Sequence, residues 1–201
     1  VQTMIRKIVA ISILGVCLAG NVSGAEEDDV VNSINEGMEF YKNGEFAEAT
    51  SSLNYAVQLI QQKKGESLSG LLPEPLDGWA AEEAQSQAAG AAMFGGGVTA
   101  ERSYSKDNSR ISIQIVTDSP MLQGVMMMFS NPMFATADGG KMVRVGRQKA
   151  IVKFTPEDES GDLQMVVNNR FLVTVEGSGI SQDDLVNYAK AIDTKKMAEL
   201  P

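Results

Sequence analysis

The residues of this chain best suited to bind a ligand are methionines. There are eleven among 201 residues, and five of them crowd one segment: Met121, Met126, Met127, Met128 and Met133. Thioether sulfur is a soft ligand that suits Cu(I). Three consecutive methionines point in three directions around a helix, however, so they cannot all face one ion. We therefore favour a flexible apolar surface, which packs on the core or adapts to an apolar ligand, over a metal site.

Acid–base and nucleophilic catalysis lack their usual residues. The chain contains no histidine, which removes the commonest general base and a frequent metal ligand. The single cysteine, Cys17, lies in a segment that we expect to be removed. A serine paired with Lys141, Lys149 or Lys153 is conceivable, yet no spacing singles one out. We predict that the protein is not an enzyme and uses no cofactor.

Two further segments carry residue types found at ligand sites. The acidic stretch 157–162 offers oxygen ligands for Ca²⁺, but the complete calcium loop with its terminal Glu is missing. Charged turns are common because they discourage sheet edges from pairing, so we favour a solvated turn. The triple glycine 95–97 is not followed by Gly-Lys-Ser/Thr, so a phosphate-binding loop is not indicated. We predict no metal site.

The first 25 residues resemble a secretory signal. Arg6 and Lys7 precede an apolar run at 8–18, and small residues at 22–25 suit cleavage. The run is shorter than the roughly 20 residues that a membrane helix needs. We predict a signal peptide at 1–25, membrane contact only through it before cleavage, and export to the periplasm.

The charge of the chain bears on its partners. With 17 basic and 26 acidic residues, the net charge is −9. Nucleic acid favours a basic surface, so we predict no nucleic-acid partner. The expected partner is another protein or a second copy of this chain.

Two helices are predicted at about 28–42 and 46–63, from apolar residues at helical spacing. Gly44 can take the positive φ that ends the first helix. Small residues fall where the helices would touch, and larger apolar residues lie between them. The full pattern is Gly37, Phe40, Gly44, Phe46, Ala49, Leu53 and Ala56.

This pattern resembles one tetratricopeptide (TPR) unit, a scaffold that binds other proteins. The resemblance spans 37–56, and Ser33 and Glu36 stand where that family has Trp and Leu. Stacked helical repeats need about three units to bury a core, so a single hairpin at 26–63 must dock on its own sheet, on a second copy or on a partner. The resemblance implies protein–protein contacts, for which the candidate side chains are Tyr41, Phe46 and Tyr55.

A linker is predicted at 64–97, because Pro73 and Pro75 favour extended backbone. Its stretch 80–92 is compatible with a helix or a loop. Trp79 directly follows a turn and is expected to anchor the linker on the next domain.

From Val98 the apolar period becomes two, which predicts an α+β domain at 98–201 with about six antiparallel strands. The predicted strands are 98–105, 110–117, 141–146, 148–155, 162–168 and 170–176. Helices at 119–130 and 181–192 are expected to cover the sheet, the second opening with a capping box formed by Ser181 and Asp184. The order of elements resembles the Mog1/PsbP-like folds in topology only.

Together these patterns predict an exported, non-enzymatic binding protein of the α+β class. An N-terminal helical hairpin precedes an antiparallel sheet of about six strands covered by two helices, and the hairpin contacts the partner. The alternative is a carrier or sensor of a small apolar ligand, held by the Met-rich helix over the sheet.

Overall fold

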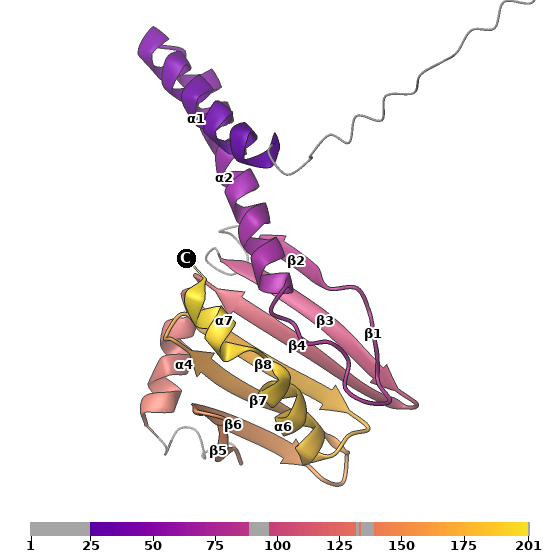
Figure 1. The fold of residues 1–201 in the computed structure, drawn as a ribbon. Helices are drawn as coiled ribbons and strands as arrows, with labels where there is room; N and C mark the ends of the chain where they lie inside the picture. Colours follow the sequence, from indigo (N-terminus) through magenta and orange to yellow (C-terminus); the bar gives the residue numbers. More distant parts are fainter. Residues whose placement is uncertain (1–24, 89–96, 132, 134–138, 201) are drawn as a thin grey trace, which may run out of the picture.

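A computed structural model describes residues 25–88, 97–131, 133 and 139–200 (Figure 1). A pair of helices is followed by an antiparallel sheet and further helices. The α+β architecture is therefore confirmed, with eight strands where about six are predicted.

The first two helices, α1 (Ala25–Asn43) and α2 (Phe46–Ser69), form the expected hairpin. Gly44 has φ 81° and its N–H donates to the carbonyl of Tyr41 at 3.1 Å. The N–H of Glu45 donates to the carbonyl of Phe40 at 2.9 Å, which completes a Schellman motif at the C-terminus of α1. α2 continues to Ser69, past its predicted end at 63, so the first residues of the expected linker are helical.

The two helices approach closely because the residues between them are small. The buried positions along this contact are Ser33, Gly37, Ala49, Ser52 and Ala56. A Cβ at Gly37 would lie 2.8 Å from Cγ of Leu53, so glycine is what allows the approach. The Ser52 hydroxyl also donates to the Glu36 carboxylate at 2.8 Å.

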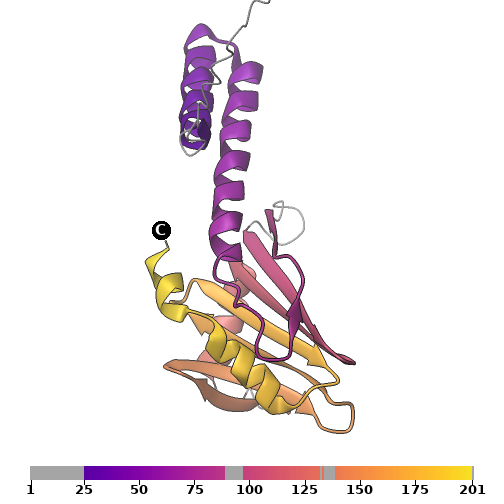
Figure 2. The ribbon, with the colours of Figure 1, turned by 45° about the vertical axis from the view of Figure 1, so that its right-hand side comes forward.

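Only part of the hairpin reaches the rest of the molecule. α2 packs on the sheet through its C-terminal half, where a Cβ at Gly65 would lie 2.7 Å from Oγ of Ser86. The upper parts of α1 and α2 extend away from the sheet (Figures 1 and 2). The hairpin therefore projects, and most of it does not dock on its own domain.

The sheet has the order β1-β3-β4-β8-β7-β6-β5, with β2 also paired to β3, and all of its pairs are antiparallel. Its strands are β1 (Ala80–Ala81), β2 (Gln85–Ala88), β3 (Val98–Lys106), β4 (Ser109–Thr117), β5 (Lys141–Val145), β6 (Gln148–Thr155), β7 (Ser160–Val167) and β8 (Phe171–Ser178). The six predicted strands correspond to β3 to β8.

The stretch 80–92, for which a helix or a loop is predicted, begins instead with the two short strands β1 and β2. Both pair with β3, in the registers Ala80↔Ser105 and Ser86↔Ala100. An unpaired β3 would leave a row of backbone donors and acceptors at the sheet edge, and the two strands satisfy them. The rest of the stretch, 89–92, lies outside the described residues, as do Gly95 and Gly96 of the triple glycine.

The predicted helices lie on opposite faces of the sheet. α6 (Gln182–Ala191) and α7 (Thr194–Glu199) cover one face, and α4 (Met121–Ser130) lies behind the other (Figures 1 and 2). The capping box of α6 is confirmed, since the N–H of Asp184 donates to Oγ of Ser181 at 3.3 Å and the N–H of Ser181 donates back to the Asp184 carboxylate at 2.9 Å.

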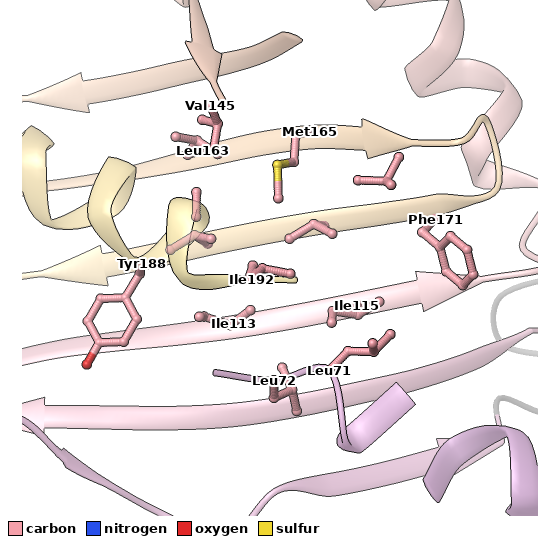
Figure 3. Close-up of a cluster of buried hydrophobic side chains, with 14 of the residues drawn as sticks. Leu71, Leu72, Ile113, Ile115, Val145, Leu163, Met165, Phe171, Tyr188 and Ile192 are labelled. Atoms are coloured by element: carbon pink, nitrogen blue, oxygen red, sulfur yellow. The ribbon is translucent and has the colours of Figure 1, made fainter. Parts of the chain in front are cut away.

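The core lies between the sheet and α6. Leu71 and Leu72 from the linker pack beside Tyr188 of α6 over Ile113 and Ile115 of β4 (Figure 3). The expected role of Trp79 is confirmed, because its ring meets that of Tyr188 edge-on at 5.3 Å between centroids. The linker that carries the hairpin is thus part of the core.

Candidate functional site

One side of the hairpin carries a row of exposed apolar side chains, which we name the apolar face. Its members are Val31, Ile34, Met38 and Tyr41 on α1 and Phe46, Leu53, Val57 and Ile60 on α2. Their exposed fractions run from 37% to 66%. On each helix they recur at spacings of three, four or seven residues, which places them on one stripe.

The stripes of α1 and α2 join into one surface. At the tip of the hairpin, the rings of Tyr41 and Phe46 lie 5.7 Å apart. Midway, Leu53 lies against Gly37. At the base, Val31 and Ile60 line the same pocket. The apolar face therefore runs from the tip of the hairpin to its junction with the sheet.

The pocket at the base, which we name the base pocket, has a volume of about 580 Å³. Its apolar lining comes from α1, α2, β8 and the residue after α7: Val30, Val31, Ile60, Leu68, Phe171 and Leu200. The other lining residues are polar or basic: Lys63, Lys64, Ser67, Thr117 and Arg170.

Two basic residues of the base pocket are held by other groups. Nζ of Lys64 lies 2.9 Å from the carboxylate of Asp118, which is also 3.9 Å from Nε of Arg170. Arg170 further donates to the carbonyl of Leu200 at 3.0 Å.

The volume of the base pocket is within the range of about 300–1,000 Å³ that is usual for small-molecule pockets.

The apolar face is also free of charge along α2. From Ala49 to Gln62 the helix has no charged side chain. On α1, the carboxylate of Glu36 is engaged by Ser52 at the contact between the helices. Depletion of charge and enrichment in aromatic residues and methionine are typical of protein–protein interface cores.

The structure separates the predicted partner-binding residues. Tyr41 and Phe46 lie together at the tip of the apolar face. Tyr55 is exposed as well, but it stands about 200° around the α2 axis from Leu53, at about 100° per residue, and so faces the other way. Small residues lie where the helices touch, as predicted, and the larger apolar residues of the sequence pattern, Phe46 and Leu53, lie on the exposed face.

The Met-rich segment does not form a described ligand site. The side chains of Met127 and Met133 are 69% and 80% exposed, and those of Met126 and Met128 are half-buried. The side chain of Met121 lies outside the described residues. None of the other four methionines, whose side chains the structure describes, lines the base pocket.

A shallow polar hollow lies on the outer face of the sheet, between β4, β7 and β8. It is lined by Arg110, Ser112, Ser160, Gly161, Asp162, Glu176, Gly177 and Ser178. Burial raises the pKa of the Asp162 carboxyl, an effect that Lys153 partly opposes. Asp162 belongs to the acidic stretch 157–162, and the described residues contain no group of three or more aspartate, glutamate, histidine or cysteine side chains able to hold a metal ion.

Among the described residues, no helix is both long enough and apolar enough to cross a membrane. Comparison of the chain with protein-family models, with curated proteins and with solved structures finds no match.

Proposed function

We propose that this protein is an exported, non-enzymatic binding protein whose apolar face docks on an apolar helical surface of another polypeptide. The observation that carries the proposal is the uncovered area. At about 200 Å² for a large side chain, the exposed fractions of the eight members leave roughly 800 Å² of apolar surface open to solvent. Soluble monomers rarely expose contiguous apolar patches beyond a few hundred Å².

The size and chemistry of the face suit a protein partner. Specific interfaces bury about 800 Å² on each side. A groove between two helices with apolar residues at helical spacing is a usual receptor for another amphipathic helix. The TPR-like pattern at 37–56 supports the same function, and export rests on the signal-like segment 1–25.

Site-specific photo-crosslinking in producing cells tests this proposal. A photoreactive residue at Met38, within the face, should yield a crosslinked polypeptide that mass spectrometry identifies. The matched control is the same residue at Tyr55, which is equally accessible but lies on the opposite side of the hairpin. Equal crosslinking at both positions, or none at Met38, would show that the face is not a docking surface.

The base pocket supports a second candidate, a carrier or sensor of a small apolar ligand. Its position differs from the Met-rich helix predicted for this role. Native mass spectrometry of protein purified from its own cells should then show a bound apolar molecule. Val30→Trp, which fills the pocket, should release it, whereas Met38→Trp, elsewhere on the hairpin, should not. A ligand-free mass for the unaltered protein would exclude the carrier.

A further inference from the structure

We infer that the occupant of the apolar face is a second copy of this chain, docked antiparallel so that two hairpins form a four-helix bundle. The inference rests on the proposed function and names the partner. Its grounds are the spacing of the apolar residues, the symmetry of the face and the charge of the chain.

The spacing is that of bundle-forming helices. On α1, Val31, Ile34, Met38 and Tyr41 are separated by three, four and three residues. On α2, Leu53, Val57 and Ile60 are separated by four and three, and Phe46 precedes Leu53 by seven. Alternation of three and four places apolar residues at the core positions of a helical bundle. Each hairpin therefore supplies two of the four helices that such a bundle requires.

The face is also self-complementary. In a two-fold interface, each contact between two positions occurs twice, with the copies exchanged. The α1 row is centred near residue 36 and the α2 row at residue 53. These centres lie at one height, because Leu53 contacts Gly37. A two-fold axis at this height, lying in the interface and perpendicular to the helices, places the two hairpins antiparallel. The tip residues of one copy then lie on the base residues of the other, Tyr41 on Val31 and Phe46 on Ile60.

This arrangement gives the base pocket an occupant. Val31 and Ile60 line that pocket, so the aromatic tip of the second copy arrives at its apolar walls. The pocket has the volume of sites that hold drug-sized ligands, which is sufficient for aromatic rings. The pocket and the tip then form one interface.

Charge favours self-association through this side of the molecule. Two copies with a net charge of −9 repel each other, and the repulsion is least where both surfaces lack charge. The uncharged stretch of α2 from Ala49 to Gln62 is such a surface. A lipid surface is a poorer match, because helices that lie on membranes carry Lys and Arg on the polar face, whereas α1 carries mostly acidic residues there.

Sedimentation equilibrium of the full chain, with Cys17→Ser to remove its only thiol, tests the stoichiometry. A dimer is expected at about 1–100 µM. Met38→Glu or Val57→Glu places a carboxylate in the interface and should raise the dissociation constant roughly 100-fold or more. Tyr55→Glu adds the same charge on the opposite side and should leave the dimer intact. Circular dichroism confirms that each variant folds, and if one face variant does not fold, the other one provides the test.

Disulfide trapping tests the orientation. Chains carrying Tyr41→Cys should form a mixed disulfide with chains carrying Val31→Cys, and neither should pair with itself. Self-pairing of Tyr41→Cys would show a parallel arrangement and overturn the inference.

A monomer at about 100 µM, or a dimer that survives both glutamate variants, would overturn the inference as well. If Met38 then still crosslinks to a different polypeptide in cells, the proposed function stands without self-association. If Met38 crosslinks to nothing, both fail.

Discussion

Two buried tyrosines under the linker should respond in opposite ways to loss of their hydroxyl groups. The rings of Tyr104 and Tyr188 lie 4.6 Å apart, and both are fully buried. The Tyr104 hydroxyl donates to the carbonyl of Pro73 at 2.6 Å. The Tyr188 hydroxyl lies near the backbone of Leu76 but meets no partner at hydrogen-bonding geometry within the described chain.

The magnitudes follow from these contacts. A buried polar group without a partner costs about 1–3 kcal/mol. Tyr188→Phe removes that cost and should raise the free energy of unfolding by about 1 kcal/mol. Tyr104→Phe loses a hydrogen bond, but the Pro73 carbonyl still accepts a hydrogen bond from the guanidinium of Arg102 at 3.1 Å. This variant should therefore lower the free energy of unfolding by only about 1–2 kcal/mol.

Urea unfolding of the two variants beside the unaltered chain measures both effects, provided that the slope with denaturant does not change. The two midpoints should shift in opposite directions. A loss of more than about 1 kcal/mol in Tyr188→Phe would show that its hydroxyl has a partner that the structure does not reveal. A neutral Tyr104→Phe would show that the bond to Pro73 does not help to hold the linker on the sheet.

Two further predictions concern pH and the capping of α6. Burial raises the pKa of the Tyr104 and Tyr188 hydroxyls above 10, so these groups ionise at lower pH in the unfolded chain than in the folded one. Their contribution to stability is fully present below about pH 10 and is lost as the pH rises further. Urea midpoints measured at about pH 8 and 11 should show this fall in stability, and the fall should be smaller in Tyr104→Phe. A fall of the same size in Tyr104→Phe and the unaltered chain would contradict the prediction. Ser181→Ala removes the capping box and should cost about 1 kcal/mol, whereas the exposed Ser51→Ala should cost almost nothing. Equal effects of the two serine variants in thermal unfolding would mean that the cap is not stabilising.

Local patterns in the sequence predict most of the sheet. The two-residue period marks β3 to β8, and the turns between them fall at residues with positive φ, such as Asp107, Gly146 and Asn168. The strands β1 and β2 are not predicted, because the composition of 80–92 is compatible with a helix. Their conformation depends on the free edge of β3, which is a tertiary contact that no local pattern contains.

The candidate site is predictable only in part. The spacing of Tyr41, Met38 and Leu53 marks apolar stripes, but it does not tell whether another part of the chain covers them. Small residues such as Gly37 and Ala49 form the contact between the helices, as predicted, and the larger side chains are left outside it. The base pocket joins residues near 30, 60, 170 and 200, a combination that only the folded chain brings together.

Carbene footprinting of the purified chain tests most directly whether the apolar face is covered. In a single copy, Tyr41 and Phe46 are 66% and 63% exposed, more than Tyr55 at 53%. If a second hairpin covers the face, Tyr41 and Phe46 should be labelled less than Tyr55. Labelling of Tyr41 and Phe46 above Tyr55, in the order of their single-copy exposure, would contradict a covered face.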